Sequence, residues 1–402
     1  MSVNRSQSAA VAGSPVSTRL PVPDHAEQEK SIALIKHIIA RMQAEPDQTL
    51  SFAQYMDELL YHPQWGYYSS GQVRFGKDGD FITAPERSPL FARGLLCEWL
   101  ASVDEHSADF VEYGAGSGQL AVDLLPAMEQ AHCLPERYFI IERSAALIER
   151  QRARFSAALP AHLAEKVCFI SRLDQSNWQG GMIVANEVLD ALACERLKWR
   201  YNQPDTVKQM RVGFDGQRFV WSAASANEEI VNAMRMVSER LADRAVSDSV
   251  YCELNLQAPV FLQDLFVQLQ AEGKPARILL FDYGGRSADV YNPERADGTL
   301  RCHFRHLAHN DPFVYPGLQD ITAWVDFEQI QHAAQAAGFE QEGWLNQGQW
   351  LLKTSVPDEL ANQMQQTKDQ VQQIRLAQQL RDLVMPGEMG ERFQLLALRY
   401  DP

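Results

Sequence analysis

The sequence lacks any long uninterrupted run of hydrophobic residues. No apolar stretch approaches the roughly 18–20 residues that a helix needs to cross a bilayer, so we expect no membrane partner. Basic residues are also in short supply, because 37 Lys and Arg stand against 52 Asp and Glu, a formal net charge of −15. Binding to nucleic-acid phosphates needs a basic surface that releases counterions, so this balance argues against a nucleic-acid partner.

Paired cysteines are missing as well. The six cysteines are scattered along the chain and form no Cys-x-x-Cys pair. In a chain of 402 residues this pattern is typical of reduced, mostly buried thiols rather than of a disulfide framework. We therefore predict a cytoplasmic protein.

The N-terminal segment has neither an acidic residue in its first twenty positions nor a hydrophobic stretch of seven residues. It does contain Arg5, Arg19 and five serines, a composition with a faint likeness to a transit peptide. Gly13 and Pro15 interrupt any amphipathic helix. We interpret residues 1–25 as a disordered tail, with a targeting role as the alternative.

The rest of the chain divides by its hydrophobic pattern. Residues 26–108 combine helical periodicity with a loop rich in glycine and aromatic side chains, which defines an N-terminal helical and loop region. From residue 109 to 402 short apolar strands alternate with helices, which predicts βαβ units and a mostly parallel sheet. An α+β cap is expected to be inserted at about 195–270.

Seven strands are expected in this sheet. Five of them come first, at 109–113, 137–142, 166–170, 181–186 and 277–284. Two late strands, 349–354 and 392–400, would close the sheet as a pair, separated by a Gln-rich helix at 357–384 that Pro386 ends. This predicts the Rossmann-like α/β sheet of class I methyltransferases.

A glycine-rich loop, EYGAGSGQLA at 112–121, follows the first strand and opens a helix. Gly114, Gly116 and Gly118 fall in a G-x-G-x-G pattern, whereas the dinucleotide fingerprint would need glycine where Gln119 stands. Glu112 before the glycines is suited to the cationic amine of S-adenosylmethionine (SAM). We therefore predict a SAM site, although a tight strand–helix turn alone would also explain the glycines.

Glu142 supports the same interpretation from the next strand. It ends the strand at 137–142, where a carboxylate can accept hydrogen bonds from both hydroxyls of a ribose. Glu142 therefore completes a predicted cofactor set with Glu112 and the three glycines.

A second group of acids, in the segment NEVLDA at 186–191, follows the fourth strand. Asn186, Glu187 and Asp190 would cluster at the carboxyl edge of the sheet, where ligands bind in open α/β folds. Carboxylates at this edge suit a substrate nitrogen, and a guanidinium pairs with them in bidentate fashion. We predict a catalytic role for these three residues, and a capped helix start with solvated acids is the alternative.

Taken together, the motifs resemble the MidA family of class I SAM-dependent methyltransferases, which is related to a mitochondrial complex I assembly factor that methylates a protein arginine. The resemblance rests on GKDGDFITAPE (76–86), EYGAGSGQLA (112–121), ANEVLDAL (185–192), LLFDYGG (279–285), PGLQDITAWVDF (316–327) and PGEMGERFQLLAL (386–398). It covers nearly everything from about residue 30 to 400. Two departures bear on substrate choice. Trp324 stands where the family often has His, and ERSPLF at 86–91 differs from the family's usual sequence in this segment.

The resemblance implies methyl transfer from SAM to an arginine of a partner protein. Gly114, Gly116, Gly118 and Glu142 fall on the family's cofactor motif, and Asn186, Glu187 and Asp190 on the motif after strand four. The alternatives are an assembly scaffold that binds SAM weakly, and a methyltransferase acting on small molecules or RNA. A homodimer is left open.

Three histidines, His303, His306 and His309, recur at intervals of three after Cys302 and invite a metal interpretation. Their segment lacks a helix cap, and this spacing in an irregular loop fixes no tetrahedral geometry. We expect no metal. Asp282, at the end of the fifth strand, remains either a core-edge residue or a site residue.

Overall fold

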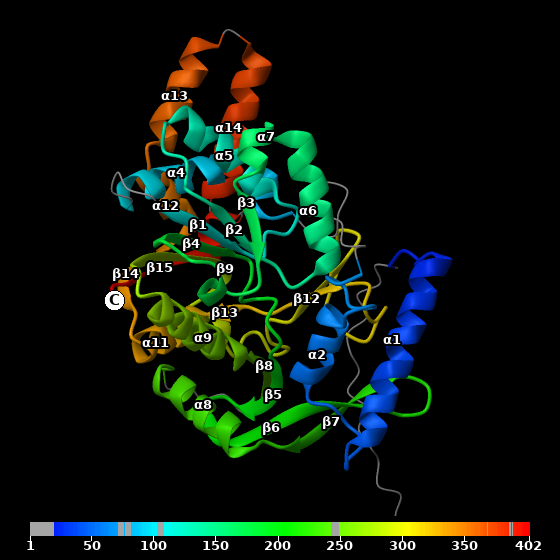
Figure 1. The fold of residues 1–402 in the computed structure, drawn as a ribbon. Coiled ribbons are helices and arrows are strands. Elements are labelled where there is room, and N and C mark those ends of the chain that lie inside the picture. Colours follow the sequence, from blue (N-terminus) through cyan, green and yellow to red (C-terminus); the bar gives the residue numbers. More distant parts are fainter. Residues whose placement is uncertain are drawn as a thin grey trace, which may run out of the picture.

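The computed structural model describes residues 20–70, 76, 82–102, 108–242, 249–367, 369–385, 387 and 389–402 (Figure 1). Most of the predicted N-terminal tail lies outside these residues, as do Pro386 and most of the segment 71–81. Within the described part of the chain, no helix is both long and apolar enough to cross a membrane.

Seven strands form the central sheet in the order β14-β15-β9-β4-β1-β2-β3. Strands β1, β2, β3, β4 and β9 run parallel, and β15 lies antiparallel between β9 and β14. A short strand, β13 (Val325–Asp326), pairs with the end of β9 outside this path. The predicted Rossmann-like methyltransferase sheet is thereby confirmed. Its strands are β1 (Asp109–Tyr113), β2 (Tyr138–Ile141), β3 (Val167–Ile170), β4 (Gly181–Asn186), β9 (Ala276–Gly285), β14 (Glu340–Asn346) and β15 (Phe393–Tyr400).

Helices cover both faces of this sheet because its inner strands are buried on both sides. Successive side chains of β1 alternate between two hydrophobic clusters: Phe110 packs with Leu124 of α5, and Val111 packs in the cluster that holds Leu265 of α9. The helices that surround the sheet are α4 (Leu90–Ser102), α5 (Gln119–Gln130), α6 (Ala145–Ala158), α7 (Ala161–Ala164), the 3₁₀ turn η2 (Leu173–Gln175), α9 (Gln257–Glu272), α10 (Ser287–Val290) and α11 (Phe327–Ala337).

Of the two predicted late strands, one is confirmed and the other was wrong. Strand β15 lies close to the predicted 392–400, but 349–354 is largely helical: α12 spans Gln347–Lys353, and the edge strand is β14 before it. Asn346 decides this, because its side chain accepts from the backbone N–H of Gln349 while Gln349 bonds back, a capping box that starts the helix. Trp350 is then buried on the helix's inner face.

The predicted Gln-rich helix is two helices, not one. Helix α13 (Val356–Gln366) ends at Thr367, and Asp369 caps the start of α14 (Gln370–Val384). The pair stands out from one end of the molecule in Figure 1. A short helix, α15 (Met389–Arg392), then leads into β15.

Two small antiparallel sheets and the N-terminal helices pack at the other end of the sheet. One sheet has the order β7-β6-β5-β8 and the other β11-β10-β12. Helix α2 joins them, because Leu59 shares one hydrophobic cluster with Val212 of β6 and Ile321 of β12. The elements are α1 (His25–Ala44), α2 (Phe52–Tyr61), α3 (Ala84–Arg87), β5 (Glu195–Arg200), β6 (Gln203–Phe214), β7 (Phe219–Ser225), α8 (Glu228–Glu239), β8 (Ser249–Leu254), β10 (Arg301–Phe304), β11 (Leu307–His309) and β12 (Asp320–Thr322).

Candidate active site

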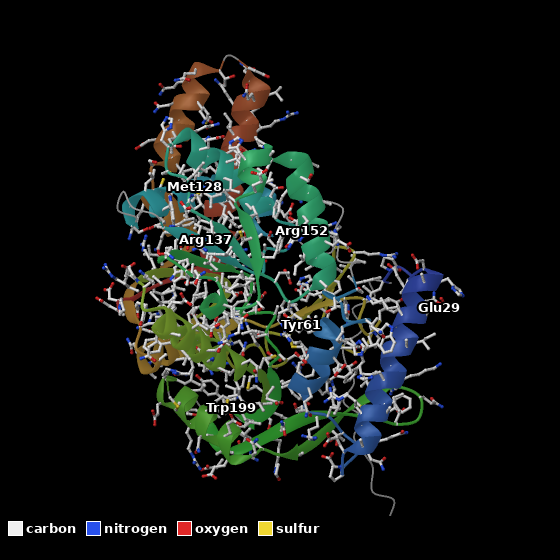
Figure 2. All side chains as sticks on the ribbon, in the orientation of Figure 1. Glu29, Tyr61, Met128, Arg137, Arg152 and Trp199 are labelled. Atoms are coloured by element: carbon white, nitrogen blue, oxygen red, sulfur yellow. The ribbon has the colours of Figure 1, made fainter. Side chains whose placement is uncertain are left out.

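A cavity of about 720 Å³ opens at the carboxyl ends of β1, β2 and β4. This volume lies within the roughly 300–1,000 Å³ that is usual for small-molecule sites. Its wall also takes residues from α2, α3 and the β10–β12 sheet. Figure 2 places Tyr61, the last residue of α2, near the middle of the molecule, where the small sheets approach the central one.

Seven of the eight predicted site residues lie in the wall of this cavity. They are Glu112, Gly114, Gly116, Glu142, Asn186, Glu187 and Asp190. Gly118 is not among the lining residues. It takes φ +80° as the N-cap of α5, and a Cβ there would lie 2.7 Å from the ring of Phe155. Gly118 therefore serves helix–loop packing.

The glycine loop forms a cradle that larger residues would fill. Gly114 and Gly116 both have left-handed backbones, with φ of +62° and +54°. A Cβ on Gly114 would lie 3.1 Å from Cγ2 of Val188, which belongs to the loop after β4. Gln151 holds the loop in place by donating from Nε2 to the carbonyl oxygen of Gly116 at 2.8 Å. The loop thus keeps its main chain open to the cavity.

Two carboxylates flank the cradle. Glu112 is buried, and the Tyr138 hydroxyl donates to its Oε2 at 2.6 Å. Burial raises the pKa of Glu112 to about 7 despite that hydrogen bond, and the charge of Glu142 adds to the rise. Glu142 accepts from the backbone N–H of Ser144 at 2.9 Å, and burial raises its pKa as well. Two desolvated acids beside a glycine cradle fit the cationic amine and the ribose hydroxyls of SAM.

The loop after β4 carries the second group of acids. Asn186 ends β4, and Glu187 follows with a left-handed φ of +55°, which is uncommon for a residue with a side chain. Glu187 accepts from Nδ2 of Asn186 at 3.2 Å. Asp190 is buried, and its Oδ1 has no hydrogen-bond partner among the described residues. These acids line a cavity and are not the solvated acids of a surface helix.

Asp282 explains why the loop adopts this path. It is fully buried, does not line the cavity, and accepts from the backbone N–H groups of Leu189 at 2.8 Å, Asp190 at 3.2 Å and Tyr283 at 2.7 Å. The alternative left open by the sequence is thereby decided. Asp282 supports the loop from the core side, behind the acids that face the cavity.

The acids of the loop share one poorly solvated space. Burial raises the pKa of Glu187 to about 8, and the neighbouring charge of Asp282 adds to it. Burial raises the pKa of Asp190 well above its usual range, with further contributions from Asp282 and Glu187. A cation in the cavity would reverse these shifts, because it favours the ionised carboxylates. These two acids therefore favour a bound cation.

Sequence reasoning missed the aromatic part of the cavity wall, and it offered Asp320 only as an alternative residue to hold the guanidinium. Tyr61, Tyr68 and Asp320 line the cavity, although they come from α2, the segment after it, and β12. Their shared signal in the sequence is weak, because tyrosines in a glycine-rich loop are equally compatible with simple packing. Asp320 does lie inside the PGLQDITAWVDF motif.

The three histidines weighed as metal ligands do not come together. His303 lies on β10 and His309 on β11, and the register pairs Cys302 with His309 and His303 with Ala308. His303 and His309 therefore point to opposite faces of the ribbon. His306 lies in the turn between the two strands.

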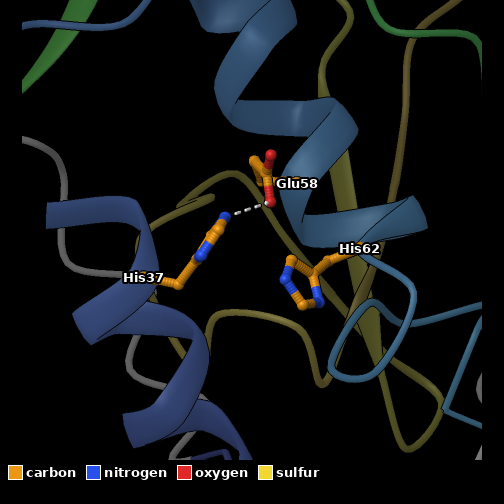
Figure 3. Close-up of side chains that lie close together, drawn as sticks. All are labelled: His37, Glu58 and His62. Carbon is orange, nitrogen blue, oxygen red and sulfur yellow. Dashed lines mark ion pairs between the residues drawn. The ribbon is translucent and has the colours of Figure 1, made fainter. Parts of the chain in front are cut away.

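Another group of metal-type ligands, His37, Glu58 and His62, lies between α1 and α2 (Figure 3). Nδ1 of His62 accepts from the backbone N–H groups of Gln64 and Trp65, both at 3.2 Å, so its proton sits on Nε2, the nitrogen that faces the group. Glu58 is paired with the guanidinium of Arg41 and lies 3.2 Å from Nε2 of His37. This arrangement suits an ion pair that joins the two helices.

Comparison with known proteins gives matches over most of the chain. The Methyltransf_28 model, which describes S-adenosyl-L-methionine-dependent methyltransferases, matches residues 90–345. The crystal structure of a COG1565 superfamily member from Burkholderia thailandensis, bound to S-adenosyl-homocysteine, superimposes with a TM-score of 0.83 at 33% identity, covering 95% of each chain.

The similarity extends to arginine methyltransferases of animals. The protein arginine methyltransferase NDUFAF7 homolog of Drosophila melanogaster is 29% identical over 373 residues, covering 86% of this chain and 80% of its own length. Protein arginine methyltransferase NDUFAF7 of Rattus norvegicus is 26% identical over 401 residues, covering 93% and 86%. Both are mitochondrial proteins.

This last point corrects the prediction of a cytoplasmic location. The relatives from Drosophila melanogaster and Rattus norvegicus are mitochondrial, and so is the NDUFAF7 protein of Homo sapiens. These locations contradict the prediction. The prediction failed because reduced, unpaired cysteines exclude oxidising compartments but do not distinguish among reducing ones. Residues 1–19, which include most of the predicted tail, lie outside the described structure.

Proposed function

The chain belongs to the Methyltransf_28 family of SAM-dependent methyltransferases, and from this premise we propose that it methylates an arginine side chain of a partner protein. The observation that carries the proposal is the pair of desolvated acids, Glu187 and Asp190, facing the same cavity as the glycine cradle. The arginine specificity of the curated relatives supports it.

The cofactor half of the cavity is assigned to the residues whose chemistry suits it. Glu112 would hold the amine of SAM, Glu142 the ribose hydroxyls, and the open main chain at Gly114 and Gly116 would lie against the ligand. When bound, SAM supplies a methyl group on a positively charged sulfur. Because that sulfonium is already activated, the chain's own task is to position the acceptor and to complement its charge.

Glu187 and Asp190 act on the acceptor. Their carboxylates bind the guanidinium, and an ionised Glu187 keeps electron density on the nitrogen to be methylated. The methylated nitrogen must lose a proton, and the ionised Glu187 carboxylate beside it can take that proton up. Asn186 steadies Glu187 through its 3.2 Å hydrogen bond.

Transfer of labelled methyl groups tests this proposal. The full chain and methyl-tritiated SAM are incubated with the protein fraction of a cell lysate, the proteins are hydrolysed, and the labelled amino acids are separated. We expect label in methylated arginine, and its loss with Glu187→Gln but not with Glu229→Gln, an exposed acid on α8. Label confined to methyl-lysine, to carboxyl esters or to small molecules would overturn the proposal.

A further inference from the structure

Asp320 brings a third acid to the cavity from a separate element. It starts β12, is 3% exposed, and lines the same space as Glu187 and Asp190. The two parts of the wall are joined, because the backbone N–H of Ala323 donates to the carbonyl oxygen of Asp190 at 3.1 Å. Burial raises the pKa of Glu187 and Asp190 most, and the charge of Asp320 raises both further, so the three acids lie within electrostatic range of one another.

Asp320 is held in place by a built aromatic wall. The hydroxyl of Tyr68 donates to its Oδ1 at 2.7 Å. The ring of Tyr68 stacks on that of Tyr61, with centroids 5.5 Å apart, and the Tyr61 hydroxyl donates to the carbonyl oxygen of Ala191 at 3.0 Å. The main chain of Tyr68 is fixed as well, because its carbonyl oxygen accepts from the Ser144 hydroxyl at 2.8 Å.

The loop acids lack a positive partner within the described part of the chain. No ion pair joins Glu187 or Asp190 to a cationic side chain there, although five basic residues also line the cavity: Arg143, Arg172, Arg301, His303 and Arg392. Arg172 is paired with Asp174 and Asp264. Arg143 lies over the ring of Tyr61, and Arg301 donates to the side chain of Asn310. The acids are thus left for a cation that comes from outside.

We propose that Asp320, oriented by Tyr68, is a second carboxylate arm that binds the substrate's guanidinium together with Glu187 and Asp190, and that it makes the site select arginine over lysine. The inference rests on the proposed function and deepens it. In these terms Asp320 is a substrate-binding residue and Tyr68 is a positioning residue.

The shape of the guanidinium explains why carboxylates from two elements would select arginine. It is a rigid plane with five N–H donors spread over its edges, so carboxylates from two elements can each take a different edge. A lysine ammonium is a compact charge with three donors and cannot span two such arms. A carboxylate offers about four acceptor positions, so Asp320 can bind a substrate while it accepts the Tyr68 hydrogen bond.

Binding measured without turnover tests this directly. The full chain is saturated with S-adenosylhomocysteine and titrated calorimetrically with Nα-acetyl-arginine methylamide and with the corresponding lysine compound. The variants are Asp320→Asn, which keeps the side-chain volume, and Tyr68→Phe, which removes only the hydroxyl. Asp358→Asn, at an exposed acid on α13, is the matched control.

We expect the wild type to prefer the arginine compound. Asp320→Asn should weaken it by about tenfold to hundredfold, as for one charged hydrogen-bonding group, and should narrow the preference over lysine. Tyr68→Phe should weaken it by less, in the same direction. Affinity for S-adenosylhomocysteine should stay within a factor of two, and in methyl transfer KM should rise more than kcat falls.

The inference is overturned if Asp320→Asn and Tyr68→Phe bind the arginine compound within a factor of two of wild type, or if both lose S-adenosylhomocysteine binding in parallel, since that is a structural role. Labelling of lysate proteins separates this failure from that of the proposed function. If the wild type labels arginine while both variants keep its arginine preference, only the assignment of Asp320 as a second substrate-binding carboxylate fails. If the wild type labels no arginine, the proposed function fails too.

Discussion

At the scale of single residues, the conformation of Glu187 is the feature that most needs an explanation. A left-handed backbone costs a residue with a side chain on the order of 1–2 kcal/mol, yet Glu187 adopts it at φ +55°. The backbone N–H of Glu187 donates to the carbonyl oxygen of Phe281 at 2.9 Å, and Asp282 holds the residues that follow. Such strain is retained at functional sites when the surroundings fix it.

We expect Glu187→Gln to separate acceptor binding from cofactor binding. The amide keeps the volume and the backbone but removes the charge that pairs with a guanidinium. Methyl transfer should fall by about 10²–10³ in kcat/KM, the usual effect of removing a preorganised electrostatic contact. SAM affinity, measured by calorimetry, should stay nearly unchanged, and Asp190→Asn should show a milder form of the same pattern. Loss of SAM binding in Glu187→Gln would instead make Glu187 a cofactor ligand.

The same residue should make stability depend on pH. Burial raises the pKa of Glu187 from its ordinary 4.5 to about 8 in the folded protein. Between these values the folded chain keeps a proton that the unfolded chain has released, so raising the pH across this window favours unfolding. We predict that the free energy of unfolding of the ligand-free protein falls from pH 5 to pH 8, by up to about 1.4 kcal/mol per pH unit for one such proton.

Urea denaturation at pH 5 and pH 8 checks this prediction. Glu187→Gln should flatten the dependence, whereas Glu229→Gln, at an exposed site on α8, should leave it as it is. Asp190 and Asp282, whose pKa values are also raised by burial, keep part of the slope in every variant. An identical slope in Glu187→Gln and wild type would mean that Glu187 is ionised in the folded protein across this range.

At the scale of elements, the sequence predicted those features that depend on neighbouring residues in the chain. Strand β1, the glycine loop and the acids after β4 were all found from the sequence, because each is a short local motif within or directly after a strand. The segment QWLLKT was mistaken for a strand, since three consecutive apolar residues fit either state and the capping box at Asn346 was overlooked. Tyr68 and Asp320 could not be paired in advance, because only the tertiary fold brings them together.

Two glycines of the loop, Gly116 and Gly118, should respond differently to substitution. Gly116→Ala and Gly118→Ala both place a side chain in a left-handed backbone, at a cost of about 1–2 kcal/mol. The Cβ of Gly118→Ala would also lie 2.7 Å from the ring of Phe155, and this overpacking should cost about 1–3 kcal/mol more. Gly116→Ala, at the cavity wall, should lose more SAM affinity than stability.

Thermal unfolding and calorimetric titration with SAM measure the two effects in parallel. Gly216→Ala, in the turn between β6 and β7, is a suitable control, because it is also left-handed and a Cβ there would meet nothing within 4 Å. The assignment of Gly118 to packing would be contradicted if Gly118→Ala were as stable as this control while its SAM affinity alone was lost.

At the scale of the whole molecule, the cavity depends on three regions that are distant in the sequence. The central sheet supplies Glu112, Glu142 and Glu187, α2 and the segment after it supply tyrosines, and the β10–β12 sheet supplies Asp320. The sequence predicted the first contribution, because the carboxyl edge of a parallel sheet is a known position for ligands. It offered Asp320 only as an alternative residue to hold the guanidinium and did not predict the tyrosines, because no local pattern indicates which segments pack over that edge.

The central claim is that this one cavity transfers a methyl group from SAM to a protein arginine. Tandem mass spectrometry of lysate proteins, incubated with the full chain and SAM carrying a trideuterated methyl group, tests it most directly. We predict heavy methyl groups on arginine side chains of a small set of proteins, and their absence when Glu187→Gln replaces the wild type. Heavy methyl groups only on other side chains, or on arginine to the same extent with Glu187→Gln, would contradict it.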